Sequence, residues 1–168
     1  ITTLRRDVET DGRHAVVSFS DDWAEDAQRR DFTMNTLLMD LEGQIYDPTG
    51  QGLTDLKAGR VVFVGNPVLR IAEDRLRILR FFRFYGLYGD GAPDAQALEA
   101  CKGAAYTIKD LSRERITQEF FKIMMFDDPS PTLQLMFKHM VLCEFDFKAL
   151  AGLTVLCRLQ VQAARSSL

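Results

Sequence analysis

The sequence predicts an α+β fold in which short antiparallel strands come first and helices follow. In the first third, short β-branched and apolar runs, such as residues 15–19 and 60–64, alternate with turn residues. Later, apolar residues recur every three or four positions, the period of an amphipathic helix. The change falls at Asn66–Pro67, so we expect one unit at residues 1–66 and a helical unit at residues 67–168.

Composition narrows the classes of protein that this chain can belong to. The 168 residues include 46% hydrophobic residues, enough to bury a core, and carry a net charge of −3. Any contact with nucleic acid must therefore use local patches rather than a global basic field. No apolar run approaches the roughly 18–20 residues of a membrane span, and no signal-peptide pattern opens the chain. Three widely spaced cysteines favour reduced thiols, so we expect a cytoplasmic protein without a disulfide framework or a zinc site.

Local signals predict the elements of the first unit. Residues 22–30 favour a helix, because Trp23 and Ala27 lie one turn apart on one face of an otherwise polar segment. Residues 37–46 predict a hairpin, with Leu41-Glu42-Gly43 at its tip. Asp47-Pro48-Thr49-Gly50 reads as a turn, because proline presets φ and glycine accepts a positive φ.

Caps and helix breakers delimit the helices. Thr54 or Asp55 is a candidate cap for a short helix that ends at Gly59. Ser112 is the expected N-cap of a later helix, with Glu114 in its first turn. Further helices are expected at residues 71–88, 95–104, 132–142 and 150–164.

The stretch from Arg70 to Arg83 is rich in arginine and contains no lysine. On one continuous helix, steps of three residues place a row on one face, formed by Asp74, Arg77, Arg80 and Arg83. The opposite face is apolar and consists of Leu76, Leu79 and Phe82. One interpretation is an amphipathic helix with surface ion pairs, such as Glu73 with Arg77. The exclusive use of arginine favours the other interpretation, recognition of base edges or phosphates.

A second cluster, Arg29-Arg30-Asp31-Phe32-Thr33-Met34-Asn35, gathers two cations, a carboxylate, a hydroxyl and an amide around one aromatic side chain. This combination suits a nucleotide, with arginine for phosphate oxygens and Asp31 for a sugar hydroxyl. The alternative is a helix end at which the arginine pair offsets the helix dipole and Asp31 is a turn residue.

Four segments together carry a resemblance to a known family: residues 29–35, 47–50, 70–84, and 112–116 with Glu119. In order and spacing they resemble the bacterial class II tRNA nucleotidyltransferases, which are the CCA-adding enzymes, and their poly(A) polymerase relatives. The resemblance runs from about Thr2 to Met140. It implies a partial nucleotidyltransferase (polymerase beta-like) head with short antiparallel strands, followed by a helical neck and the start of a helical body.

The resemblance also implies roles for individual residues. Those expected to contact the nucleotide are Arg30, Asp31, Asp74, Arg77, Arg80 and Arg83. Among them, Asp31 would hold the ribose, and Asp74 and Arg77 would read the base edge. Supporting roles are implied for four residues: Asp47 and Gly50 in a flexible turn between the sugar and base sites, and Glu114 and Arg115 as braces of the base-reading helix.

The chain departs from the family at the metal site. The family has a Gly-rich turn followed by Asp-x-Asp on a strand, and this motif is missing; Asp40-Leu41-Glu42 has a similar spacing but sits at a hairpin tip. We therefore expect that the sequence begins after that strand and that Mg²⁺ is held by carboxylates outside it. The chain alone should then be inactive. A supporting carboxylate is expected among Asp7, Glu9 and Asp11, without a choice between them.

The implied reaction is attack of the tRNA 3′-hydroxyl on the α-phosphorus of CTP or ATP, with release of pyrophosphate. The implied partners are the tRNA 3′ end, CTP and ATP. A poly(A) polymerase or an enzyme that adds only A shares every motif quoted. A noncatalytic RNA-binding helical module is the alternative of another class, and it predicts RNA binding that is indifferent to the nucleotide.

Overall fold

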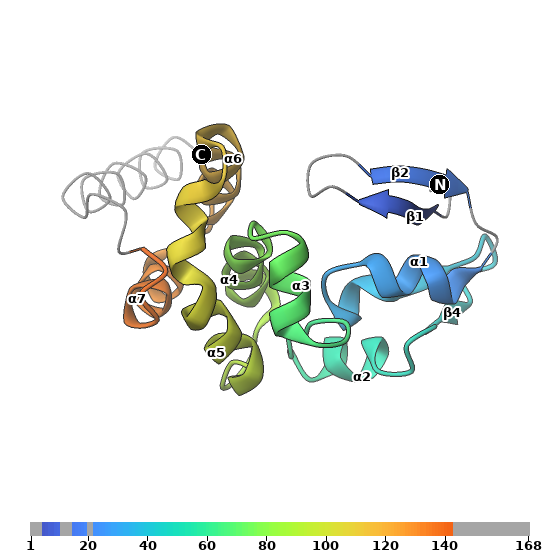
Figure 1. Ribbon diagram of the computed structural model, residues 1–168. Helices are drawn as coiled ribbons and strands as arrows, with labels where there is room; N and C mark the ends of the chain where they lie inside the picture. Colours follow the sequence, from blue (N-terminus) through green and yellow to red (C-terminus); the bar gives the residue numbers. More distant parts are fainter. Residues whose placement is uncertain (1–4, 11–14, 20–21, 143–168) are drawn as a thin grey trace, which may run out of the picture.

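The computed structural model describes residues 5–10, 15–19 and 22–142 (Figure 1). The strands are β1 (Arg5–Thr10), β2 (Ala15–Phe19), β3 (Leu38–Met39) and β4 (Ile45–Tyr46). The helices are α1 (Trp23–Arg29), α2 (Gly52–Lys57), α3 (Pro67–Glu73), α4 (Arg77–Tyr88), α5 (Ala95–Ala104), α6 (Arg113–Met124) and α7 (Ser130–Lys138), with 3₁₀ helices η1 (Thr33–Thr36) and η2 (Ala105–Asp110). The α+β fold class is confirmed, while the helix expected at 150–164 lies outside the described residues.

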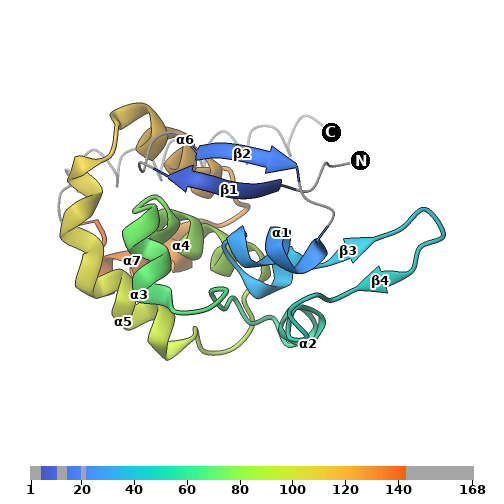
Figure 2. The same cartoon turned by 45° about the vertical axis from the view of Figure 1, so that its right-hand side comes forward.

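The strands form two separate antiparallel pairs, β1 with β2 and β3 with β4. The predicted hairpin is present as β3–β4, with Gly43 at a φ of 86° near its tip, and it extends away from the helices (Figure 2). The strand expected at residues 60–64 is wrong as a member of a sheet. Within the described residues this segment is extended and forms one isolated bridge, between Phe63 and Phe32. The ladder cannot continue, because the chain enters η1 directly after Phe32.

A cluster of phenylalanine side chains joins the two parts of the chain. Phe32 is fully buried, and its ring centroid lies 4.9 Å from that of Phe63 and 5.1 Å from that of Phe84. Phe63 in turn stacks on Phe81 of α4 at 5.8 Å. One hydrophobic core therefore extends from the segment after α1 into the helices. The boundary at Asn66–Pro67 stays a prediction; Asn66 caps α3 there by accepting the Val68 N–H at 2.9 Å.

Helix α4 is the central helix of the later part, because it contacts α3, α5, α6 and α7. The continuous helix expected at residues 71–88 is wrong, because the chain breaks between α3 and α4. Asp74 has extended dihedral angles (φ −147°, ψ 107°), and its Oδ1 accepts the N–H of Leu76 at 3.1 Å. Such a bond from an Asp side chain to the backbone two residues on competes with the helix. The expected apolar face survives the break, since Leu76, Leu79 and Phe82 are all buried.

Of the other helices, the one expected at residues 132–142 is found as α7, shifted to Ser130–Lys138. Helix α5 is found at the expected residues, and Ser112 caps α6 by accepting the Arg115 N–H. Neither Thr54 nor Asp55 caps α2, because both lie inside it. Instead Asp47 accepts the Leu53 N–H at 3.0 Å and satisfies the first turn from outside the helix. No helix among the described residues is long and apolar enough to cross a membrane.

A matched pair of glycine substitutions tests how closely α4 and α7 pack. Gly86→Ala should lower the free energy of unfolding by about 1–3 kcal/mol, the usual cost of overpacking. A Cβ at Gly86 would lie 2.3 Å from Oγ1 of Thr132 and 2.6 Å from Phe126. Gly103→Ala on α5 meets nothing within 4 Å and should raise stability by up to about 1 kcal/mol through helix propensity. Chemical denaturation measures both, and equal effects would contradict the close packing.

Candidate functional site

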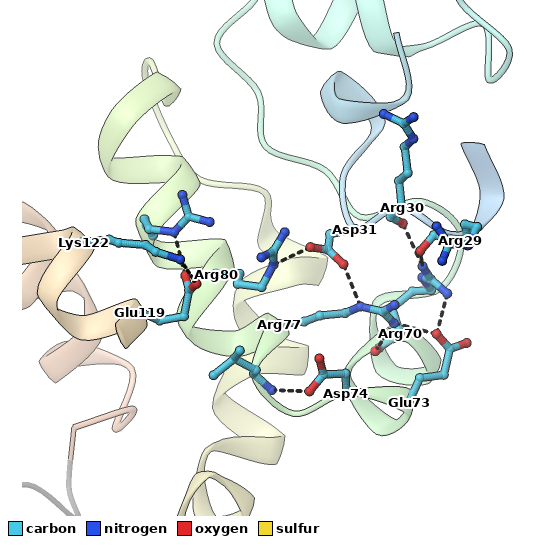
Figure 3. Close-up of polar contacts among 12 residues, drawn as sticks. Arg29, Arg30, Asp31, Arg70, Glu73, Asp74, Arg77, Arg80, Glu119 and Lys122 are labelled. Carbon is cyan, nitrogen blue, oxygen red and sulfur yellow. Dashed lines mark hydrogen bonds and ion pairs between the residues drawn. The ribbon is translucent and has the colours of Figure 1, made fainter. Parts of the chain in front are cut away.

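The candidate site is centred on the Asp31 carboxylate, which faces the start of α4 (Figure 3). Arg77 Nε donates to its Oδ1 at 2.9 Å, and Arg80 Nε donates to its Oδ2. The side chains of Asp31 and Arg77 are only 13% and 12% exposed, so water screens this ion pair less than a surface pair. The fold thus brings together one carboxylate and two guanidinium groups from distant parts of the sequence.

The position of Asp31 follows from its neighbours. Phe32, the next residue, is locked in the aromatic cluster. The Asp31 carbonyl accepts the Val64 N–H at 3.0 Å, and the Thr33 N–H donates to the Val62 carbonyl at 2.9 Å. Backbone bonds on both sides and a buried ring between them fix the direction of the carboxylate.

A second set of contacts orients Arg77. Its Nη1 donates to the Arg70 carbonyl at 2.6 Å and to Oε2 of Glu73 at 2.5 Å. Arg70 Nη2 donates to the carbonyls of Arg29 and Arg30, at 2.8 and 2.7 Å. Arg70 therefore ties α3 to the segment that carries Asp31. The motif pattern implies no role for Arg70, although the all-arginine run includes it.

Asp74 lies in the turn between α3 and α4 and not on a helical face with Arg77, so the expected row on one helix is wrong at this residue. Both Asp74 carboxylate oxygens accept from Arg115 Nη2 of α6, at 3.0 and 2.8 Å. This is the contact that a bracing role for Arg115 requires. Glu114, the other expected brace, is exposed on α6, and the α6 side chain that bonds to Asp74 is Arg115.

Arg83 is separated from Asp31 and bonds to α6 instead. Its Nε donates to Oε2 of Glu119 at 2.7 Å, and its guanidinium lies 4.5 Å from the Phe84 ring centroid. Lys122 Nζ donates to the other Glu119 oxygen at 2.7 Å. Burial alone would raise the pKa of Glu119, but the hydrogen bonds from Lys122 and Arg83 outweigh it and hold the pKa below its ordinary value. Glu119 thus fastens α6 to α4.

Arg30 also points away from Asp31 (Figure 3). Its Nε donates to Oδ2 of the buried Asp26 at 2.8 Å, and its Nη1 donates to the Asn35 carbonyl at 2.7 Å. In this conformation Arg30 holds α1 against η1. Its expected contact with the nucleotide stays a prediction.

The turn at residues 47–50 is fastened to η1. Gly50 has a φ of 70°, as the turn prediction requires. Thr49 Oγ1 donates to Oδ1 of Asp47 at 3.0 Å and lies 3.2 Å from Oγ1 of Thr36. Burial alone would raise the pKa of Asp47, but hydrogen bonds from Leu53, Thr49 and the turn backbone hold the pKa below its ordinary value. The flexible role implied by the resemblance is untested by this conformation.

Asp55 is a buried carboxylate that the sequence analysis considered only as a cap. Thr33 Oγ1 donates to its Oδ2 at 2.6 Å, and Arg60 donates to its Oδ1 from Nε and Nη2, at 3.0 and 2.7 Å. Arg60 precedes the segment that bridges to Phe32. Asp55 therefore supports both chain segments that position Asp31.

None of the described residues forms a group that could hold a metal ion. Asp40 is a turn residue, because it accepts the Glu42 and Gln44 N–H groups at 3.1 and 2.8 Å. No three His, Cys, Asp or Glu side chains in the described ranges come together as metal ligands. Asp7 and Glu9 lie on β1, where only the backbone is described, and Asp11 lies outside the described residues.

Two protein families match the chain. Residues 1–62 match the family described as Poly A polymerase head domain. Residues 92–145 match the family described as Probable RNA and SrmB-binding site of polymerase A.

Relatives and solved structures agree with these matches. CCA tRNA nucleotidyltransferase 1, mitochondrial, of Danio rerio is 46% identical over 140 residues, 82% of this chain and 32% of the relative. The CCA-adding enzyme of a Geobacillus species is 37% identical over 139 residues, 81% of this chain and 34% of the relative. The crystal structure of the Bacillus stearothermophilus CCA-adding enzyme in complex with CTP has a TM-score of 0.69 at 30% identity, over 80% of this chain and 32% of that chain. This chain spans about a third of the length of these curated relatives.

The pH dependence of stability tests the Glu119 contacts. Because folding lowers the pKa of Glu119, its contribution is present above the ordinary pKa of 4.5 and is lost as the pH falls through the folded value. Glu119→Gln should lower the free energy of unfolding by about 1–3 kcal/mol at neutral pH. It should also make the free energy of unfolding fall less steeply as the pH drops below 4.5.

The control is Glu114→Gln, which changes an exposed carboxyl on the same helix. At acidic pH, the free energy of unfolding of this variant should change with pH as it does in the unmodified chain. Urea denaturation between neutral and acidic pH measures all three proteins, and parallel curves for the two variants would show that the Glu119 contacts add nothing.

Proposed function

Since the chain belongs to the family of poly(A) polymerases and CCA-adding tRNA nucleotidyltransferases, we propose that it is the nucleotide-selecting part of an enzyme that completes the tRNA 3′ end. In the proposed reaction the tRNA 3′-hydroxyl attacks the α-phosphorus of CTP or ATP, and pyrophosphate leaves. Mg²⁺ would stabilise the attacking and leaving oxygens. The described residues do not supply a set of ligands for it, so their proposed part is binding and selection.

The observation that carries the proposal is the unused bonding capacity of the site. A carboxylate offers about four acceptor positions, and the described residues donate to two of those on Asp31, one per oxygen. A ribose hydroxyl can therefore donate to Asp31 while Arg77 and Arg80 stay in place. The deoxy analogue would leave that position empty, so Asp31 is our proposed group for selecting ribonucleotides.

Arg77 has one donor nitrogen that is available to a base. Its Nε and Nη1 are bonded to the protein, whereas its Nη2 donates to no described residue. The bonded nitrogens fix the plane of the guanidinium, and Nη2 is left to donate to a ring nitrogen of a base. On Asp74, Oδ2 accepts only from Arg115 within the described residues and keeps a position for an amine.

This pair explains how one site can accept C and A. Cytosine and adenine each present an exocyclic amine beside a ring nitrogen that accepts a hydrogen bond. In uracil and guanine, a carbonyl and a ring N–H stand in these places. They would put the carbonyl against Asp74 and the N–H against Arg77, at a cost of several kcal/mol in a partly dry pocket. The residues expected to read the base edge thus have the required donor and acceptor.

The remaining expected residues have different positions in this proposal. Arg80 shares Asp31 with Arg77 and is close enough to assist at the nucleotide. Arg30 and Arg83 would need to exchange their contacts with Asp26 and Glu119 before they could reach it. We retain both as proposed phosphate contacts of a nucleotide-bound conformation.

Two alternatives are favoured by particular observations. The name of the head family favours a poly(A) polymerase or an A-adding enzyme, which would select ATP over CTP. The match of residues 92–145 to an RNA-binding segment favours a noncatalytic RNA-binding module, which would bind no nucleotide selectively. We propose a cytoplasmic location; one relative is named mitochondrial, and fractionation of cells separates the two compartments.

Calorimetric titration of the chain with each of the four ribonucleoside triphosphates tests the proposal. We expect saturable binding of CTP and ATP, with UTP and GTP about a hundredfold weaker. Binding of ATP alone would establish the first alternative. No binding, or equal binding of all four, would contradict the proposal.

Asp31→Ala should bring the affinities for CTP and dCTP together. The substitution removes the acceptor of the sugar hydroxyl, whose loss costs about 1–3 kcal/mol. Asp40→Ala is the control, because Asp40 lies in the β3–β4 hairpin and, among the described residues, its carboxylate bonds only within that hairpin. If Asp31→Ala changes both affinities in parallel, Asp31 has a structural role only.

Asp74→Ala should weaken CTP and ATP binding and narrow the gap to UTP, because the carbonyl of uracil then meets no carboxylate. Arg77→Ala should weaken both as well. The same titrations with all four triphosphates give the result. Unchanged selectivity in both variants would show that the base is read elsewhere.

A further inference from the structure

A groove of about 820 Å³ lies between α3, α5 and η2. Its volume is in the range of sites that hold small organic ligands, about 300–1,000 Å³. From α3 it is lined by Val68 and Ile71, whereas the neighbouring Arg70 and Glu73 face the Asp31 site. The groove is therefore separate from the nucleotide site already described, although the two share α3.

The groove has an apolar floor and a polar rim. Ile71 and Ala100 in the floor are buried. The polar side chains that line it are Asn66, Arg75, Gln96, Glu99, Tyr106 and Thr107; Asn66 caps α3, and Thr107 donates to the Ala104 carbonyl. Within the described part of the chain, the side chains of Gln96, Glu99 and Tyr106 make no hydrogen bond, and Arg75 makes one loose ion pair, 4.0 Å from Asp110. A cation, an amide, a carboxylate and an aromatic ring thus line one groove, and apart from the Arg75–Asp110 ion pair these side chains form no hydrogen bond with the described residues.

We propose that this groove binds one unpaired nucleotide of an RNA strand. The exposed Tyr106 ring offers a face on which a base can stack, the usual device for single-stranded RNA. Gln96 and Glu99 on the α5 side meet the polar edge of the base, and Arg75 binds a phosphate. Because Glu99 accepts only, a base with an amine fits better than uracil.

A second observation points to RNA as the occupant. Gln96, Glu99 and Tyr106 all fall within residues 92–145, the segment that matches an RNA-binding family. A groove lined by both a cation and a carboxylate is also a poor match for a purely hydrophobic peptide. Val68 and Leu69 on α3 are exposed apolar side chains. Docking of a protein on this side is therefore the competing explanation that the experiment must distinguish from RNA binding.

The groove is placed to serve the proposed reaction, and this reading rests on the proposed function. Arg75 lines the groove and directly follows Asp74, which contacts Arg115 at the nucleotide site. Two consecutive residues of one turn thus belong to the two sites. An RNA nucleotide in the groove lies against the turn that reads the incoming base, as an acceptor strand must.

The test is RNA binding by the chain, measured by fluorescence anisotropy with a labelled tRNA transcript that lacks its terminal CCA. Tyr106→Ala should weaken binding about tenfold, the effect of losing one base–aromatic stack, and Tyr106→Phe should restore it. Tyr88→Ala is the matched control, because Tyr88 is 52% exposed at the end of α4 and does not line the groove. It should bind RNA as the unmodified chain does.

A second arm tests the base edge. Single-stranded oligo(C) should bind more tightly than oligo(U), and Glu99→Ala should abolish the difference. Binding of RNA by Tyr106→Ala at unmodified strength, or a failure of Tyr106→Phe to restore it, would overturn the proposal. So would an effect of Tyr106→Ala confined to self-association of the chain, measured by ultracentrifugation.

CTP affinity of the same variants separates this inference from the proposed function. Tyr106→Ala should leave the affinity for CTP unchanged, because the ring lies outside the Asp31 site. If CTP binds selectively while RNA binding ignores Tyr106, the groove proposal fails and the proposed function stands. If the unmodified chain shows no selectivity for CTP and ATP, the proposed function fails whatever the RNA result.

Discussion

The shared ion pair of Asp31 with Arg77 and Arg80 is the interaction on which the rest of this structure depends. It joins the segment after α1 to the first turns of α4, and it is mostly shielded from water. Breaking one side would leave a poorly solvated charge without its partner, which costs far more than an exposed pair is worth. The other polar contacts of the site can be understood as supports of this pair: Glu73 and Arg70 orient Arg77, and Asp55 holds both Thr33, next to Phe32, and Arg60, at the start of the segment that bridges to Phe32.

The same contacts explain how a site can be preorganised and still have room for a ligand. Each charged group uses some of its hydrogen-bonding positions for contacts within the protein, and its other positions are available to a ligand. Among the described residues, Asp31 keeps one acceptor position per oxygen, and Arg77 keeps Nη2. A nucleotide can therefore add to the network without dismantling it, so less binding energy is lost in reorganisation. The groove beside α3 is less preorganised, because the side chains of Gln96, Glu99 and Tyr106 are exposed and form no hydrogen bond with the described residues.

Sequence reasoning found what depends on local spacing and missed what depends on distant partners. The ends of α5, the Ser112 cap and the burial of Leu76, Leu79 and Phe82 all follow from neighbours within a few residues. The break at Asp74 was missed, because apolar spacing continues across it and only a side-chain bond to the backbone reveals it. Asp55 and Arg70 were missed for another reason: their partners lie 22 and about 40 residues away. The proposed site residues came from motif order, whereas their bonding required the fold.

A crystal structure of the chain with CTP tests the central claim most directly. We expect a ribose hydroxyl within hydrogen-bond distance of Asp31, with Arg77 and Arg80 still bonded to that carboxylate. We also expect the cytosine ring nitrogen at Arg77 Nη2 and the amine at Asp74. CTP bound away from Asp31, or bound there only after Arg77 has left the carboxylate, would contradict this claim.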